Sequence, residues 1–122
     1  MSKTIYIVER EANLRATLSY LLERQGYTVR TLADGDAGAS AVQESPPDLA
    51  LLGIDLDRRG GFDLCQSFRA DPACENMKII FLTSKARSVE RGKGLALGAN
   101  AYITKPFANA DLLAQVANLL ED

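Results

Sequence analysis

The sequence predicts an α/β fold in which five parallel strands form one sheet and helices cover both of its faces. Short apolar runs alternate with segments of helical character, which is the element order of a doubly wound parallel sheet. The run Leu49–Leu52 is continuously apolar, as expected for a strand that is buried on both faces. The chain has 122 residues, the length of one ordinary domain, and we expect residues 1–122 to form a single domain.

The first half of the chain contains three of the expected strands and two of the helices. The strands are Thr4–Val8, Tyr27–Leu32 and Leu49–Leu52. Leucines at positions 14, 18, 21 and 22 form a stripe on one face of the first helix, and Gly26 follows where a C-terminal glycine belongs. Asp34 is placed to cap an alanine-rich helix that continues through Val42. The prolines at 46 and 47 end this second helix.

The second half of the chain supplies the remaining elements. They are a helix at Phe62–Phe68, strands at Lys78–Leu82 and Ala101–Ile103, and a final helix that buries Leu112, Leu113, Val116, Leu119 and Leu120. Another helix, expected from position 88 to 97, contains Gly92 and Gly94, and each costs about 1 kcal/mol relative to alanine in a helix interior. Two interpretations stay open: the helix shifts readily until a partner orders it, or the glycines allow close packing.

Composition excludes several classes of function. The chain is 47% hydrophobic and 25% charged with a formal net charge of −2, so nothing favours a nucleic acid or an anionic membrane as partner. No apolar run approaches the ~18 residues of a membrane span and no signal-peptide core is present, so we expect a cytoplasmic protein. The absence of histidine removes Ser-His-Asp and Cys-His catalysis, imidazole metal ligands and a phosphohistidine relay on this chain.

Polar motifs follow four of the apolar runs. They are Glu9-Arg10-Glu11, Gly53-Ile54-Asp55, Thr83-Ser84-Lys85 and Thr104-Lys105-Pro106. In open parallel sheets, ligands bind beyond the carboxyl ends of the strands, where the strand order reverses. All four motifs come at the carboxyl ends of expected strands, so we expect them to converge on one pocket.

From Thr4 to about Leu120, the chain resembles the receiver domain of two-component response regulators. The most specific stretch is Lys78–Phe107, with "KIIFLTSKA" and "GLALGANAYITKPF", and "GYTVRTLADGDAGA" and "PPDLALL" are weaker but correctly placed. The resemblance implies a flavodoxin-like sheet with strand order 2-1-3-4-5. It also implies a mechanism: an aspartate after the third strand takes a phosphoryl group from a phosphohistidine of a kinase, beside Mg²⁺ held by an acidic pair.

Carried over position by position, part of this pocket is present. Thr83 occupies the hydroxyl position and Lys105 the lysine position, which in the family bind the phosphoryl oxygens. Pro106 follows, and the resemblance implies a cis Lys105–Pro106 bond. Tyr102 occupies the aromatic switch position, which the family couples to the face formed by its last helices.

Two positions depart from the family pattern. The acceptor position aligns with Gly53, which has no nucleophile, and the acidic pair aligns with Glu9 and Arg10. Glu9 and Arg10 cancel in charge, so Lys105 leaves the expected pocket net positive, and Glu9 is at most a single metal ligand. We therefore expect no bound magnesium and no other cofactor. Arg10 is either a solvated surface residue or lies over the pocket and pairs with Glu9.

These departures predict a receiver-like signalling domain that is not phosphorylated at the usual site and acts by protein–protein interaction. We expect no enzymatic activity, because the pocket offers no convincing nucleophile and no histidine base. The resemblance implies a protein partner, either a histidine kinase or a downstream regulator. It also implies a contact surface at 88–120, through which two copies can form a homodimer.

Two alternatives to this interpretation stay open. Asp55 can serve as a substitute phosphoacceptor with Glu9 as metal ligand, although it lies ~6–7 Å further along the chain than Gly53. The pocket can also hold an anionic small molecule without turnover, since Arg10 and Lys105 make it cationic.

Overall fold

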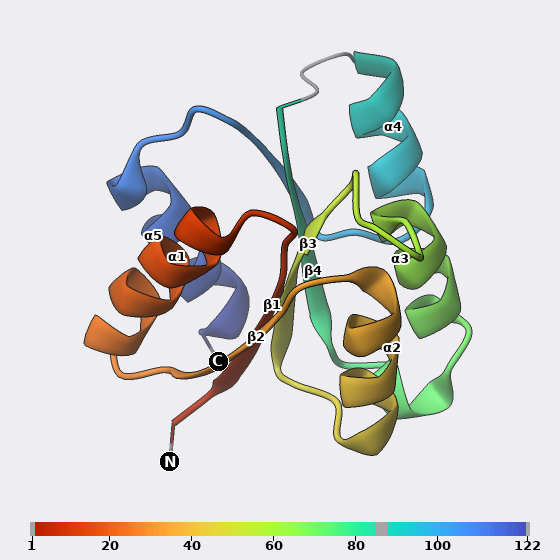
Figure 1. The fold of residues 1–122 in the computed structure, drawn as a ribbon, viewed down its shortest axis with the longest axis horizontal. Coiled ribbons are helices and arrows are strands. Elements are labelled where there is room, and N and C mark those ends of the chain that lie inside the picture. Colours follow the sequence, from red (N-terminus) through yellow and green to blue (C-terminus); the bar gives the residue numbers. More distant parts are fainter. Residues whose placement is uncertain (1, 85–87, 122) are drawn as a thin grey trace.

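The computed structural model describes residues 2–84 and 88–121, which form one five-stranded parallel sheet with helices on both faces (Figure 1). The strands are β1 (Thr4–Val8), β2 (Thr28–Leu32), β3 (Leu49–Gly53), β4 (Lys78–Thr83) and β5 (Ala101–Thr104). Their order in the sheet is β2-β1-β3-β4-β5. The predicted α/β fold and the predicted strand order are therefore confirmed.

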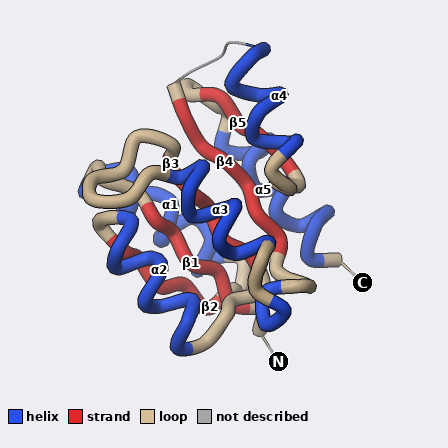
Figure 2. The backbone as a smooth tube through the Cα atoms, turned by 90° about the vertical axis from the view of Figure 1, so that its right-hand side faces the viewer, coloured by secondary structure: helices blue, strands red, loops and turns tan. Residues whose placement is uncertain are grey.

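The helices alternate with the strands along the chain. They are α1 (Ala12–Arg24), α2 (Gly35–Glu44), α3 (Gly61–Arg69), α4 (Ser88–Ala96) and α5 (Asn109–Leu120). A short 3-10 helix, η1 (Pro72–Cys74), was not expected from the sequence. Figures 1 and 2 show α1 and α5 on one face of the sheet and α2, α3 and α4 on the other. No helix in the described part of the chain is long and apolar enough to cross a membrane.

Each face of the sheet has its own apolar layer, because successive residues of a strand point to opposite sides. Ile5 of β1 packs in the layer that contains Leu18 of α1 and Leu112 of α5. The neighbouring Tyr6 packs in the opposite layer, which contains Leu64 of α3. The sheet is thus covered on both sides, and this is why every residue of β3 is buried.

The ends of two helices are formed as the sequence predicts. Gly26, after α1, has a φ of +95°, a conformation in which glycine has no side chain to clash, and its N–H donates to the carbonyl of Glu23. At the start of α2, Oδ1 of Asp34 accepts a hydrogen bond of 2.8 Å from the N–H of Ala37. Local capping therefore fixes where these helices begin and end.

Three strands continue one residue beyond their predicted ends, to Gly53, Thr83 and Thr104. Within the sheet, Gly53 pairs with Leu82, and Thr83 pairs with Thr104. The first residue of each of these polar motifs therefore belongs to the ladder, where backbone hydrogen bonds of the sheet fix its position.

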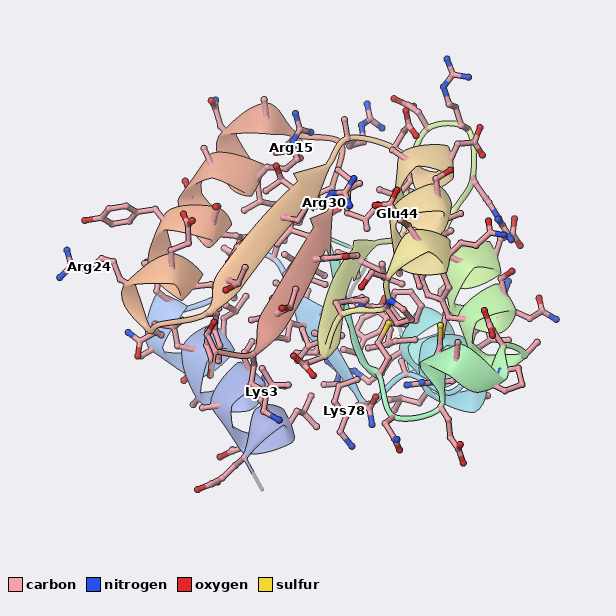
Figure 3. The ribbon with its side chains drawn as sticks, turned by 90° about the horizontal axis from the view of Figure 1, so that it is seen from below. Lys3, Arg15, Arg24, Arg30, Glu44 and Lys78 are labelled. Carbon is pink, nitrogen blue, oxygen red and sulfur yellow. The ribbon has the colours of Figure 1, made fainter. Side chains whose placement is uncertain are left out.

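The two ends of the described chain lie at the amino ends of the strands. Lys3 and Glu121 line the same hollow of about 300 Å³, together with Asp48 and Lys78, which begin or precede strands. Figure 3, which views the molecule from below, shows Lys3 and Lys78 at this end. The carboxyl ends of the strands, and everything that follows them, lie at the opposite end of the sheet.

Candidate functional site

A polar hollow of about 220 Å³ opens at the carboxyl ends of the strands, and each of the four sequence motifs contributes to it. Its lining consists of Glu9, Arg10, Glu11, Gly53, Ile54, Asp55, Leu82, Thr83, Ser84 and Lys105. The structure thus brings together five of the six pocket residues named from the sequence. The sixth, Pro106, is exposed and does not line the hollow, although the Lys105–Pro106 bond is cis as expected.

Glu9 places a buried carboxylate at the centre of this hollow. The residue follows β1 and is only 3% exposed. Its Oε1 lies 3.4 Å from Nζ of Lys105, and its Oε2 accepts a 2.9 Å hydrogen bond from the N–H of Glu11. The backbone carbonyl of Glu9 accepts a hydrogen bond from the Arg15 guanidinium. Both carboxylate oxygens therefore have partners within the chain.

Gly53 ends β3 directly beside this carboxylate. A Cβ atom at position 53 would lie 3.1 Å from Oε1 of Glu9, 3.3 Å from Cδ2 of Leu56 and 3.5 Å from the carbonyl oxygen of Val8. The first two distances are shorter than ordinary van der Waals contacts, so Glu9 and Leu56 would have to give way slightly for any side chain at this position. The Glu9 carboxylate and the Leu56 side chain thus crowd the place where a side chain of residue 53 would begin.

Arg10 is exposed at the rim of the hollow, and in the part of the chain that the structure describes it has no ion-pair partner. The ion pair of Glu9 is made with Lys105, which also lies 3.9 Å from a carboxylate oxygen of Glu11. Of the two interpretations of Arg10, the described contacts support the solvated one. The physical reason is that the buried carboxylate of Glu9 is already paired with Lys105.

The described lining of the hollow includes charged residues that the sequence-based charge count left out. Among the described residues, Glu11 and Asp55 also line it, so the described lining contains three carboxylates and two cations, Arg10 and Lys105. The sequence signal for Glu11 was its place as the third residue of the motif after the first strand, which the charge count from the acidic pair alone omitted.

Thr83 and Tyr102 are both buried, at 4% exposure, but they lie in different surroundings. Thr83 ends β4 and lines the hollow. Tyr102 lies in β5 below it, with its ring 6.3 Å from that of Phe81 and the Arg91 guanidinium 5.1 Å above its centre. The hydroxyl position and the aromatic position are thus in adjacent strands, and only the hydroxyl position reaches the hollow.

The donor set of the hollow can be compared with what a magnesium ion requires. Mg²⁺ prefers near-octahedral oxygen ligation and is commonly held through one or two carboxylates. Here both oxygens of Glu9 accept hydrogen bonds or an ion pair from the chain, and position 53 offers no carboxylate. Among residues 2–84 and 88–121, no three carboxylate or thiol side chains are grouped to hold a metal ion. The described lining therefore lacks the carboxylate that the family pattern places at the end of β3.

A doubly wound parallel sheet in the order 2-1-3-4-5, with a polar site beyond its strand ends, defines the flavodoxin-like fold. The chain belongs to the response regulator receiver domain family, whose model matches residues 5–117. The resemblance predicted from the sequence is thereby confirmed at the level of the family.

Individual relatives agree with this assignment. The chain is 39% identical over 120 residues to the phosphate regulon transcriptional regulatory protein PhoB of Rhizobium meliloti, covering 98% of this chain and 53% of that protein. It thus spans about half the length of this curated relative. A response regulator structure from Chloroflexus aurantiacus superimposes with a TM-score of 0.94 at 28% identity over 100% of both chains. The BeF3-activated N-terminal receiver domain of Klebsiella pneumoniae RstA gives 0.90 at 28% identity, covering 98% of this chain and 99% of that one.

Proposed function

We propose that this chain is a receiver domain that signals through protein–protein contacts without accepting a phosphoryl group at the usual position. The observation that carries the proposal is the residue at the end of β3, which is Gly53. An acyl phosphate requires a carboxylate nucleophile, and glycine has none. The nearest buried carboxylate, that of Glu9, is paired with Lys105.

The internal pairing of the hollow supports this proposal. Lys105 occupies the position of the phosphoryl-binding lysine, and its ammonium is directed to Glu9 and Glu11. Because the lysine and the buried carboxylate neutralise each other, neither a phosphoryl group nor a divalent ion is required to balance their charges. The proposed domain therefore does without magnesium and without any other cofactor, and it has no catalytic step of its own.

The proposed output is a protein partner, either a histidine kinase or a downstream regulator, in the cytoplasm. The contact surface is the face at 88–120, formed by α4, β5 and α5, and two copies of the chain can also meet there. Tyr102 lies under this face with the Arg91 guanidinium above its ring. Partner binding, dimerisation or the cellular level of the protein would then set the output, in place of an acyl phosphate.

Amide NMR with beryllofluoride, a mimic of an aspartyl phosphate, tests the proposal. Spectra are recorded with Mg²⁺ before and after beryllofluoride is added. We expect no shifts at Gly53, Thr83 or Lys105. The RstA receiver domain, whose solved structure is of the BeF3-activated form, is the positive control. Specific shifts that spread from the hollow to Tyr102 would overturn the proposal.

Each of the two alternatives, phosphorylation of Asp55 and binding of an anionic ligand, is tested by its own measurement on the same protein. Asp55 is exposed and lines the hollow, so a working acceptor there would give acid-labile phosphate that disappears in Asp55→Asn. An anionic ligand would raise the melting temperature in a phosphate or nucleotide screen.

A further inference from the structure

The α4 helix is attached to the sheet in a different way from α1 and α5. Leu18 and Leu22 of α1 and Leu112 and Val116 of α5 are buried. Among the described side chains of α4, residues 91–96, Leu95 is 46% exposed and only Gly94 is buried. This part of α4 therefore contacts the sheet through its backbone and not through an apolar stripe.

Gly94 is the point of closest approach between α4 and the sheet. A Cβ atom on Gly94 would lie 2.9 Å from Cδ2 and 3.1 Å from Cε2 of Phe81, and 3.4 Å from Cδ2 of Tyr102. A Cβ on Gly92, one half-turn away, would meet nothing within 4 Å. The close-packing interpretation of the two glycines thus holds for Gly94, while Gly92 faces open space.

The surface beneath Gly94 is a row of three aromatic rings. Phe62 of α3 meets Phe81 of β4 edge to face, with ring centres 5.2 Å apart at 76°. Phe81 meets Tyr102 of β5 with centres 6.3 Å apart at 62°. Both are favourable aromatic geometries. The row links α3 to β5 beneath α4, and Gly94 rests on the Phe81–Tyr102 part of it.

Two cationic side chains of α4 contact the two end rings of this row. Nζ of Lys93 lies 4.8 Å from the ring centre of Phe62, and the Arg91 guanidinium lies 5.1 Å from that of Tyr102. The same guanidinium donates a 3.4 Å hydrogen bond to the carbonyl of Tyr102. Both cations lie within the distance at which a ring face attracts a positive charge. The position of α4 is therefore tied to the orientation of the outer rings.

The Phe62 end of the row starts beside the strand-end hollow. Phe62 is the second residue of α3, and the first, Gly61, is so close to β3 that a Cβ there would lie 2.0 Å from the carbonyl oxygen of Gly53. The N–H of Gly61 donates a 3.0 Å hydrogen bond to the carbonyl of Ile54. A shift of β3 at position 53 would therefore also displace the first turn of α3.

From these contacts we propose that Phe62 couples the end of β3 to α4 through the ring row, giving the chain a route from the hollow to the α4 surface that uses no phosphoryl group and bypasses Thr83. This inference rests on the proposed function, in which α4 belongs to the contact surface. Its elements are continuous: Gly53 touches Gly61, Phe62 touches Phe81 and Lys93, and Gly94 sits on Phe81.

A Gly53→Ala substitution, read out by amide NMR in two backgrounds, tests the coupling. The added methyl group perturbs the end of β3 without adding charge. In the otherwise unchanged chain, we expect shifts at Gly61, Phe62 and the amides of residues 91–96. In a Phe62→Leu background, we expect the shifts at 91–96 to fall to a third or less while those at Gly61 persist. Equal shifts at 91–96 in both backgrounds would overturn the proposal.

Phe68→Leu is the matched control, because Phe68 is a buried phenylalanine of the same helix. We expect Phe62→Leu to speed amide exchange in α4 about ten-fold relative to exchange in α5, and Phe68→Leu to change both helices alike. A selective effect of Phe68→Leu on α4 would count against the route. Lys93→Met, an exposed change that does not threaten folding, should loosen α4 in the same selective way, and failure to do so would also contradict the proposal. None of these measurements uses a phosphoryl donor, so they stand apart from the beryllofluoride result.

Discussion

The ammonium of Lys105 lies 3.4 Å from Oε1 of Glu9, with side chains that are 24% and 4% exposed. The pair bridges the carboxyl ends of β5 and β1, which are not neighbours in the sheet, and so passes over the ends of β3 and β4. This ion pair therefore joins two strand ends that line the hollow. The two partners differ in burial, and this leads to the first prediction, since a buried carboxylate without its partner is more costly than a partly exposed ammonium without one.

Lys105→Met should destabilise the protein more than Glu9→Gln. Among the described residues, the first change leaves the buried Glu9 carboxylate with the N–H of Glu11 as its remaining partner, at a cost of about 2–4 kcal/mol. The second keeps an acceptor for that N–H and removes the charge, at a cost of about 1–2 kcal/mol. Urea denaturation of both variants measures the difference.

Glu44→Gln provides the control for this comparison. Glu44 pairs with Arg30 at 3.5 Å, and Figure 3 shows the two residues on α2 and β2, but their side chains are 75% and 49% exposed. An exposed pair of this kind contributes about 0–1 kcal/mol. A reversed order, with Glu9→Gln the more damaging change, would mean that the pair is not what satisfies the carboxylate.

Gly53→Asp alone should not restore magnesium-dependent phosphorylation. The new side chain would begin 3.1 Å from Oε1 of Glu9 and place a second carboxylate against the first, with Arg10 nearby to pair with it. Gly53→Asp combined with Arg10→Asp should do better, because it adds the missing acidic oxygen and removes the cation. Labelled acetyl phosphate measures the incorporation. Full activity of the single variant would show that Arg10 is irrelevant to the hollow.

Alanine substitutions at the two glycines of α4 should have opposite signs. Gly92→Ala meets nothing within 4 Å and should stabilise the protein by about 0.5–1 kcal/mol through helix propensity. Gly94→Ala places a methyl group 2.9 Å from the Phe81 ring and should destabilise it by about 1–3 kcal/mol. Thermal unfolding of the two variants gives the comparison, and a stabilising Gly94→Ala would contradict the close approach of α4.

Arg69→Lys should be far from conservative. The Arg69 guanidinium donates to the carbonyls of Gly98, Cys74 and Met77, and to the side chain of Asn100. An ammonium cannot reproduce this planar fork, so we expect a loss of about 2–3 kcal/mol in the free energy of unfolding.

Arg24→Lys is the control for that change, because Arg24 is exposed and its guanidinium contacts the exposed Tyr20 of its own helix. It should alter stability by less than about 0.5 kcal/mol. Denaturant midpoints that match between the two lysine variants would show that the bonds of Arg69 are not what holds the segments together.

The stability of the protein should fall as the pH rises above about 8.5, the ordinary thiol pKa. Burial raises the pKa of Cys65, against a smaller opposing effect of Arg69, and burial also raises that of Cys74. The unfolded chain therefore loses thiol protons at a lower pH than the folded one, and the stabilisation present below that pH is lost as the pH rises. Unfolding at roughly pH 8 and pH 10 should show a smaller fall in a Cys65→Ala, Cys74→Ala variant, and an equal fall would point to other groups.

Local patterns predicted the elements well because their causes are local. The leucine stripe, the Asp34 cap and Gly26 each act within one or two turns, so the bounds of α1 and α2 lie close to those expected. The η1 turn was not anticipated, although Asp71 followed by Pro72 was its signal: Oδ1 of Asp71 accepts from the N–H of Ala73. The one-residue extensions of the strands depend on hydrogen bonds to neighbouring strands, which the apolar run of one strand does not reveal.

The sequence predicted which motifs meet at the strand ends, but not which of their side chains contact one another. Strand order brings the motifs to one edge, so the hollow followed from topology. The partner of Glu9 did not, because the choice between Arg10 and Lys105 depends on the path of two loops. The contact of Gly94 with Phe81 joins residues of two different elements, and the crowding of Gly53 by Leu56 depends on how the loop after β3 turns, so no sequence pattern predicts either of them.

Lys3 and Glu121 line one hollow at the end of the sheet opposite to Gly53. A tag or tether on either end of the chain would therefore leave the strand-end hollow facing solution. Immobilised in this orientation on a biosensor chip, the protein would keep the hollow accessible to phosphate and other small anions in the solution that flows over it.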